Sequence, residues 1–549
     1  MSIFSASTAQ RERRWIVAIV IGAIILSSLP YIFGAIRAGS QATYLWTNPL
    51  GPADTNVYFS MIKQASQGRV FLENLYTSEP QRGSLFQPLW LALGWIAGMT
   101  RIAIPVLFHL VRIAFGTAFL LFLYRLFICR LFYEERQRIL AILLLAFSSG
   151  IGTFFSFNVN TSDNLQIILL LPADQWIPEA NTFLTLAHSP LFILAQLLLL
   201  AIVWSFLTTK KDTIKLFVAL VALLAIVHPY DIVTCAVLLP IFLVIRMIRE
   251  KNYLYTIAPL ALRAMILAGI IAFLPMLAFV VAGLREPAIG FWVQQNITTS
   301  PLPHSYILGY GLVVPFAVLG WMAWRKTRNA FQLLILTWAV TSIVLLYVPV
   351  QINRRFSNGL HIPLAILATV GIDVCWTWLS VVLRRHRWTR QIVLAAAGWT
   401  IGLGLFLSSL ITVARAMYWE ANPAASIYHI RRDEAQAIQW LETGTPPDAV
   451  ILAHPFIGNI IPAMTGRRVF VGHGHQTIRW PEKIDRLFNW FWKTNTDDTA
   501  KHRFLVTNGI MYVLFGPYED PIGDYDPAQK SYLVPVHTEG KVTVYRVLP

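Results

Sequence analysis

The sequence predicts an α-helical polytopic membrane protein with about 11 transmembrane helices, followed by a C-terminal α/β domain. Of its 549 residues, 56% are hydrophobic and only 13% are charged, which excludes an ordinary soluble protein. The hydrophobic residues fall in runs of about 18 to 24, and about 20 helical residues cross a hydrocarbon core of ~30 Å. After residue 414, charged residues, glycine and proline return. We therefore expect a membrane domain over 1–414 and an α/β domain over 415–549.

The basic residues indicate how the chain crosses the membrane. Much of the net charge of +16 lies in short clusters between apolar runs, at residues 11–14, 125–138, 210–215, 246–251, 325–328 and 384–390. Such clusters mark cytoplasmic loops by the positive-inside rule, so orientation and not nucleic-acid binding accounts for the charge. The sequence predicts a multi-pass protein of the plasma (inner) membrane, with a cytoplasmic N-terminus and an extracytoplasmic C-terminal domain.

The predicted spans follow from placing those clusters on one side. They lie at residues 15–36, 104–124, 139–156, 184–206, 215–229, 231–247, 261–283, 305–324, 330–349, 361–383 and 392–414. Arg11, Arg13 and Arg14 precede the first span, as basic residues precede the apolar region of a signal peptide. Because it is long and no small-residue cleavage site follows it cleanly, we expect a retained helix.

A long outer loop, 37–103, follows the first span. Its apolar segment 85–98 contains Pro88 and is too short to cross the membrane. Counting it as a span would also invert every later loop and place the basic clusters outside. We therefore expect a short helix that lies on the outer membrane surface.

The C-terminal domain combines strand and helix patterns. Alternating runs at 449–453, 467–471 and 511–515 predict strands. The segments 433–442 and 485–493 predict helices. The domain is large enough to bury a core of its own.

Metal-ligating residues are sparse. Cys129, Cys235 and Cys375 lie in or beside apolar runs, which leaves neither a zinc motif nor a disulfide framework. His473 and His475 lack further ligands at a recognised spacing. The sequence therefore assigns no metal ligands, and a requirement for a divalent cation stays open.

The first candidate site is the segment 52–58, which precedes an amphipathic stretch. Asp54 can accept a proton from an incoming hydroxyl or coordinate a cation, and Tyr58 is a candidate for binding substrate. The alternative for Asp54 is a helix N-cap.

Two further candidates lie at the predicted outer ends of spans. Glu179 could face the same cavity as Asp54, with Asn181 and His188 as substrate-binding neighbours. The alternative is that Asn181 or Thr182 caps the following helix. His228 and Asp231 form a second group, which can act as an acid, a base or a substrate hydrogen-bonding pair. The alternative is a structural hydrogen bond within a turn.

The segment 351–359 carries adjacent arginines on the predicted outer side, against the positive-inside tendency. The guanidinium groups of Arg354 and Arg355 match phosphate oxygens in two-point contact. At headgroup depth the natural ligand is a lipid phosphate, and the alternative is interfacial snorkelling.

Together these parts resemble the GT-C superfamily of membrane glycosyltransferases, which includes protein O-mannosyltransferases and aminoarabinose transferases. The resemblance covers most of the chain. It rests on an acidic residue in a long first outer loop (Asp54), "FHLVRIAFG" with Arg112 in the second span, "NRRFSNGLHIP", and the C-terminal segments "RRVFVGHG" and "YVLFGPYED". Relatives often carry an arginine at the place of Arg112, so the resemblance makes Arg112 a substrate-binding candidate.

The resemblance implies a function. The donor would be a sugar on a polyprenyl phosphate, Asp54 would activate an acceptor hydroxyl for attack with inversion, and Arg354 or Arg355 would hold the departing lipid phosphate. Many relatives have paired acids in this loop, whereas Asp54 is followed by Thr55 and Asn56, which leaves metal dependence open. No WWDYG-like motif is present, which argues against asparagine glycosylation.

Two other functions stay open. A transporter or flippase would carry ionisable residues in mid-span and show repeated halves, whereas the polar groups here collect at predicted outer ends. A non-catalytic envelope assembly protein that binds membrane lipids would share the architecture. The sugar, the acceptor and the oligomeric state are not indicated by the sequence.

Overall fold

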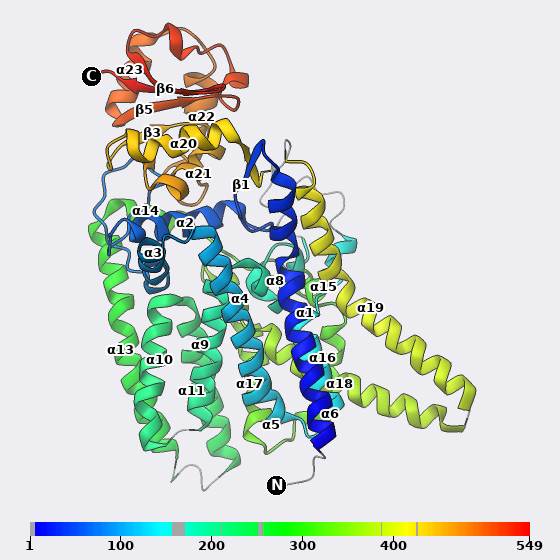
Figure 1. The fold of residues 1–549 in the computed structure, drawn as a ribbon. Helices are drawn as coiled ribbons and strands as arrows, with labels where there is room; N and C mark the ends of the chain where they lie inside the picture. The colour runs from blue at the N-terminus through cyan, green and yellow to red at the C-terminus, as the bar shows by residue number, and fades with distance from the viewer. Residues whose placement is uncertain are drawn as a thin grey trace. The chain divides into compact units, whose positions relative to one another are not determined.

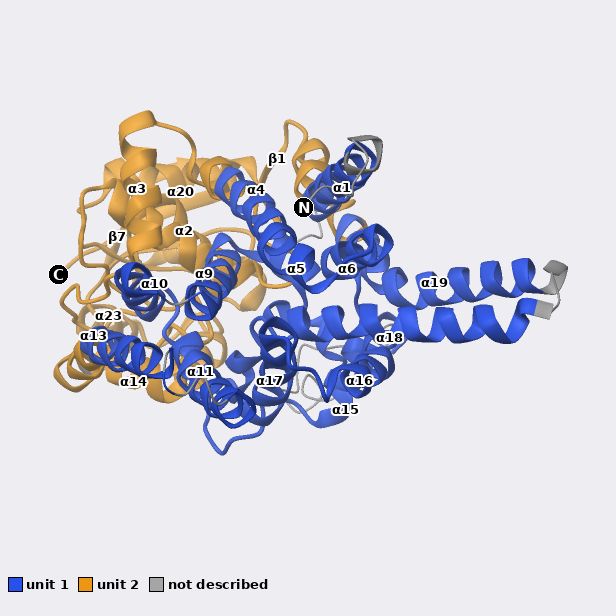
Figure 2. Ribbon diagram, turned by 90° about the horizontal axis from the view of Figure 1, so that it is seen from below, with its two compact units in different colours: residues 1–30, 110–276, 298–417 blue, residues 31–109, 277–297, 418–549 orange. Residues whose placement is uncertain are grey.

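The computed structural model describes residues 6–155, 171–208, 210–250, 255, 257–385, 387–423 and 427–549. The chain forms two compact units, which Figure 2 distinguishes by colour. Unit 1 comprises residues 1–30, 110–276 and 298–417, and unit 2 comprises residues 31–109, 277–297 and 418–549.

The predicted helical membrane fold is confirmed. Within the described ranges, eight helical segments are long and apolar enough to cross a membrane. They contain α1 (Ala6–Ala38), α4 (Ile104–Leu123), α6 (Glu135–Phe147), α9 (Pro190–Leu207), α11 (Tyr230–Arg249), α13 (Ala258–Arg285), α18 (His361–Val382) and α19 (Arg387–Glu420). The helices α10 (Ile214–Val227) and α17 (Ala330–Leu345) are shorter than the ~20 residues of a full span, so the number eleven stays a prediction.

Two of the predicted spans are interrupted. The predicted span 184–206 is two helices, α8 (Thr182–His188) and α9, because Pro190 starts a new helix whose N-cap Ser189 accepts a hydrogen bond from the Leu191 backbone. The predicted span 305–324 is also two helices, α15 (Pro303–Tyr310) and α16 (Val313–Trp324), bent by 89°.

The break between α15 and α16 falls at Gly311, whose φ of 50° suits glycine.

A third predicted span, 139–156, begins in α6 and continues through the 3-10 turn η2 (Gly152–Phe154), and its last residue lies outside the described residues.

Helices of unit 1 pack closely through small residues. The helices α9, α10 and α11 contact one another, as do α16 and α18 (Figure 1). A Cβ atom on Gly320 of α16 would overlap the Leu367 carbonyl, and one on Gly371 of α18 would overlap the Phe316 carbonyl. These two glycines therefore allow the backbones of α16 and α18 to touch.

Unit 2 is built around a five-stranded sheet in the order β4-β3-β5-β7-β6. Its strands are β3 (Val450–Leu452), β4 (Arg468–Val469), β5 (Ile510–Phe515), β6 (Leu533–Glu539) and β7 (Val542–Val547). The first three are parallel and match the predicted strands, whereas β6 and β7 form an antiparallel hairpin that the sequence analysis did not assign.

The helices of the C-terminal segment follow the predictions in part. The helix predicted at 433–442 is α20 (Arg432–Gly444). The helix predicted at 485–493 is α22 (Trp480–Arg486), which continues as the π-helical turn η8 (Leu487–Phe491). A further helix, α23 (Asp498–Thr507), precedes β5.

The first outer loop belongs to unit 2. Its strand β1 (Ala42–Tyr44) pairs with β2 (His429–Arg431). Its helix α2 (Pro52–Ser66) packs on both α3 (Pro88–Thr100) and α21 (Pro455–Thr465). The short helix predicted at 85–98 is therefore present as α3, and its place on the membrane surface stays a prediction. The helix α14 (Pro287–Gln295) also belongs to this unit.

Candidate functional site

The predicted candidates in unit 1 include a buried ion pair between Glu179 and Arg355. Two short 3-10 helices present these residues, η4 (Pro178–Ala180) and η6 (Asn353–Ser357). Arg355 Nη1 donates to Glu179 Oε1 at 2.9 Å, and the glutamate is only 3% exposed. Burial alone would raise the pKa of the Glu179 carboxyl, but the charges of Arg355 and Arg354 outweigh it and hold the pKa below its usual value. Glu179 is therefore a charged counter-ion.

The two arginines rest on different aromatic rings. The Arg354 guanidinium lies over the Trp176 ring at 4.9 Å, and the Arg355 guanidinium lies 5.8 Å from the centroid of the Tyr230 ring. Both side chains are partly exposed. Arg355 is ion-paired with Glu179, and both guanidinium groups lie at a partly exposed position, where their planar forks suit the oxygens of an anion.

A buried polar network lies next to Tyr230. His228 Nδ1 is 3.0 Å from Asp231 Oδ2, and the same oxygen accepts a hydrogen bond of 2.7 Å from Asn358 Nδ2. Gln196 Nε2 donates to Asn358 Oδ1 at 2.9 Å. Asp231 has no exposed surface, so its carboxylate orients His228 and the Asn358 amide. Neither Gln196 nor Asn358 was identified from the sequence.

Three other predicted substrate-binding residues are packed in the interior of unit 1. Asn181 caps α8, since its Oδ1 accepts from the backbones of Phe183 and Leu184, as the capping alternative had it. Arg112 is 1% exposed and donates to the Leu186 carbonyl at 2.6 Å and to Ser28 Oγ at 2.8 Å.

His188, the last of these three, is 3% exposed and meets the Phe192 ring edge to face at 5.3 Å. The hydrogen bonds of Asn181 and Arg112 join segments within unit 1 to one another. A contact of these three residues with substrate stays a prediction.

In unit 2, Asp54 is paired with a histidine from the C-terminal segment. Asp54 is the third residue of α2, whose N-cap is Gly51, so the N-cap alternative does not apply. Its side chain is 56% exposed, and Oδ1 lies 3.1 Å from His473 Nε2. His473 Nδ1 accepts hydrogen bonds from the backbones of His475 and Gln476, so Nε2 carries the proton and donates to Asp54. The pairing of Asp54 with His473 was not predicted.

Aromatic rings flank the other predicted residue of α2. Tyr58 lies one turn after Asp54 and stacks on Trp90, with centroids 4.8 Å apart and an interplanar angle of 24°. Phe108 continues the stack at 6.4 Å from Tyr58. A partly exposed aromatic ring therefore lies on the same side of α2 as the carboxylate.

Metal binding has no support in these groups. Within the part of the chain that the structure describes, no three His, Cys, Asp or Glu side chains are grouped so as to hold a metal ion. Asp54 and His473 offer two donors, fewer than the three protein ligands of a usual catalytic zinc site.

Comparison with known proteins identifies the fold. The structure is similar to ArnT from Cupriavidus metallidurans in the apo state, with a TM-score of 0.52 and 13% identity over 99% of this chain and 98% of that chain. The same protein bound to undecaprenyl phosphate gives a TM-score of 0.51 and 12% identity, over 97% and 98%.

The oligosaccharyltransferase AglB from Archaeoglobus fulgidus, in complex with an inhibitory peptide and a dolichol-phosphate, gives a TM-score of 0.49 and 14% identity over 92% of this chain and 69% of that chain. The GT-C fold that the sequence resemblance implied is confirmed by the likeness to ArnT. A search of curated proteins gives no match. A family model described as "Family of unknown function (DUF6541)" matches residues 182–548, more than half of the chain. The chain therefore belongs to the DUF6541 family.

Proposed function

We propose that this protein is a GT-C glycosyltransferase that moves a sugar from a polyprenyl-phosphate donor to an acceptor hydroxyl at the outer face of the membrane. The observation that carries the proposal is the pair of partly exposed arginines, Arg354 and Arg355, the second of which is ion-paired with Glu179. The fold supports it, because ArnT, which has the same fold, is known in a complex with undecaprenyl phosphate.

The arginines would bind the donor phosphate. Cation–π contacts with Trp176 and Tyr230 help to hold the two guanidinium groups in place before a ligand arrives. Fixed cations stabilise the negative charge that develops on the phosphate as the glycosidic bond breaks. In this proposal the phosphate competes with Glu179 for Arg355.

Asp54 would act as the general base. Its carboxylate takes the proton of the acceptor hydroxyl while the acceptor oxygen attacks the anomeric carbon, and the bond from that carbon to the phosphate oxygen breaks. The products are the glycosylated acceptor, with inverted configuration, and polyprenyl phosphate. His473 donates to Asp54 Oδ1 and would keep the carboxylate oriented.

The proposal is tested with full-length protein in liposomes that contain a panel of polyprenyl-phosphate sugars, with envelope extract as acceptor. We expect Asp54→Asn to abolish the release of polyprenyl phosphate without loss of donor binding. Arg354→Gln and Arg355→Gln should weaken donor binding by about tenfold each, the effect of one lost charged hydrogen bond.

The matched control is Asp212→Asn, an exposed aspartate in the 3-10 turn η5 (Lys211–Thr213), which should retain full activity. Full activity of the Asp54→Asn variant would reject this residue as the base. Absence of any affinity for lipid phosphates in the wild-type protein would reject the transferase proposal itself.

The interrupted helices favour a second candidate, a lipid or solute transporter, because broken spans line substrate sites in transporters. A flux assay separates the two functions. Passage of a polyprenyl-phosphate sugar across liposomes without any glycosylated product would favour the transporter. Product formation without net passage would favour the transferase.

A further inference from the structure

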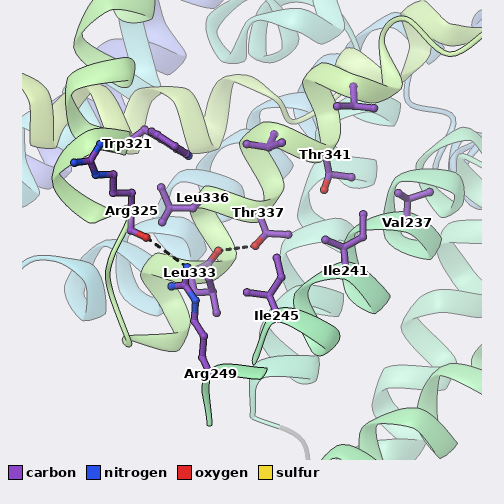
Figure 3. Close-up of a pocket in the computed structure, with 12 residues that line it drawn as sticks. Val237, Ile241, Ile245, Arg249, Trp321, Arg325, Leu333, Leu336, Thr337 and Thr341 are labelled. Atoms are coloured by element: carbon purple, nitrogen blue, oxygen red, sulfur yellow. Dashed lines mark hydrogen bonds between the residues drawn. The ribbon is translucent and has the colours of Figure 1, made fainter. Parts of the chain in front are cut away.

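Unit 1 contains a cavity of about 270 Å³ that the proposed sugar transfer does not use. Figure 3 shows that it lies between α11, α16 and α17, with apolar side chains along its length and Arg249 and Arg325 at one end. The hydroxyl of Thr337 faces it but donates to the Leu333 carbonyl of its own helix at 2.8 Å. The apolar side chains of these helices therefore line a groove that can accommodate an acyl chain.

The wall that α11 contributes is a single stripe. Val237, Ile241, Ile245 and Arg249 follow one another at intervals of four residues and thus lie on one face of the helix. From Val237 to Arg249 the helix rises by about 18 Å. Since one leaflet of hydrocarbon is about 15 Å thick, a groove of this length matches one leaflet and would place Arg249 at headgroup depth.

The charges at that end have few partners. Among the described residues, the Arg325 guanidinium has no hydrogen-bond or ion-pair partner, and Lys326 and Arg328 next to it are exposed. Arg249 donates to the Thr327 carbonyl at 2.7 Å, which ties the two segments together. The nearby acid, Glu250, is bonded to Arg246. The mouth of the groove is therefore strongly positive.

We propose that this groove binds an anionic phospholipid of the leaflet on the side of the basic clusters, which the sequence predicts to be cytoplasmic. The phosphate lies against Arg325 and Arg249, and one acyl chain lies between α11 and α17. Basic pockets between transmembrane helices on the cytoplasmic side recognise anionic headgroups in this way. The partly exposed groove residues Ile241 and Val340 give the chain access from the bilayer.

Native mass spectrometry of the full-length protein, after equilibration with equal amounts of phosphatidylglycerol and phosphatidylcholine, tests the proposal. The wild-type protein should retain phosphatidylglycerol in preference. Arg325→Gln should reduce this preference by about fivefold and Arg249→Gln/Arg325→Gln by about thirtyfold. Val340→Trp fills the groove from its exposed side and should reduce retention of phosphatidylglycerol with the arginines intact.

The matched control is Lys210→Gln/Lys211→Gln, which removes two exposed charges from another predicted cytoplasmic loop and should leave the preference unchanged. An equal loss in this control would mean a diffuse charge effect and would overturn the proposal. So would an unchanged preference in Arg325→Gln. If the protein instead retains a polyprenyl phosphate, and Val340→Trp abolishes this retention while the arginine variants do not, the groove binds the polyprenyl chain of the donor.

Discussion

Glu179 and Arg355 depend on each other's charge. Arg355→Gln leaves a carboxylate that is only 3% exposed without its ion-pair partner, and we expect the free energy of unfolding to fall by about 3 to 5 kcal/mol. Glu179→Gln should cost less, because the arginine side chain is 22% exposed and water reaches it. Thermal unfolding of the purified protein measures both. The double variant should recover part of the loss, and strictly additive losses would contradict the coupling.

His473 holds Asp54 through a proton on Nε2. If Asp54 is the base, His473→Ala removes this hydrogen bond, and we expect kcat to fall by about tenfold, the effect of one lost charged hydrogen bond, with little change in KM. The measurement is kcat and KM for sugar transfer, with His473→Gln, whose amide can still donate, as the rescue variant. Equal losses in both variants would contradict a role for the donated proton.

The buried carboxyl of Glu519 makes unit 2 sensitive to pH. Burial raises its pKa from 4.5 to about 8, although the backbones of His454 and Gly516 donate to it. Between these values the folded protein holds a proton that the unfolded chain has lost, so stability falls as pH rises from about 4.5 to about 8 and is then constant. Glu519→Gln should remove most of this decline.

Hydrogen exchange of peptides around β5, corrected for the intrinsic rate, measures the decline in the full-length protein. Asp433→Asn is the control, because Arg431 lowers the pKa of Asp433 and the decline should persist in that variant. Persistence of the decline in Glu519→Gln would refute the assignment to Glu519.

At the scale of elements, the glycines between α16 and α18 set how closely these helices approach. Gly320→Ala would place a Cβ atom against the Leu367 carbonyl, and overpacking of this kind costs about 1 to 3 kcal/mol. The melting temperature should fall. Gly269→Ala in α13 is the control, since its Cβ meets no atom within 4 Å and should leave stability unchanged or improved.

Patterns of hydrophobic residues predict helices and strands, but they fail where a single proline or glycine interrupts a helix. The long apolar runs and the strands β3, β4 and β5 follow from composition and periodicity. The breaks at Pro190 and Gly311 were missed because hydropathy averages over such residues. The hairpin of β6 and β7 had a readable signal, namely Gly540 in a tight turn between alternating runs.

The sequence predicts several residues of the candidate site, but it does not predict which side chains pair with one another. Adjacent arginines at a predicted outer end and an acidic residue in a long loop can be recognised in the sequence. Nothing in the sequence near Asp54 indicates His473, because 419 positions separate them and side-chain pairing depends on tertiary structure. The same holds for Asp231 and Asn358.

At the scale of the whole molecule, the orientation in the membrane is a testable prediction. In a cysteine-free background, Thr496→Cys in the C-terminal segment should react with a membrane-impermeant maleimide added to intact cells. Lys211→Cys should react only after the membrane is permeabilised. Both positions are exposed, so access depends on the side of the membrane. The reverse pattern would invert the predicted orientation.

The pairing of β1 with β2 has a consequence for biosynthesis. The partners of the early segment, β2 and α21, are made only after the ribosome has added more than three hundred further residues. Until then β1 has no partner strand, and α2, which carries Asp54, has α3 but not α21 to pack on. Nascent chains halted before His429 should therefore be cut by protease within the first outer loop, and chains halted after the end of β7 should resist.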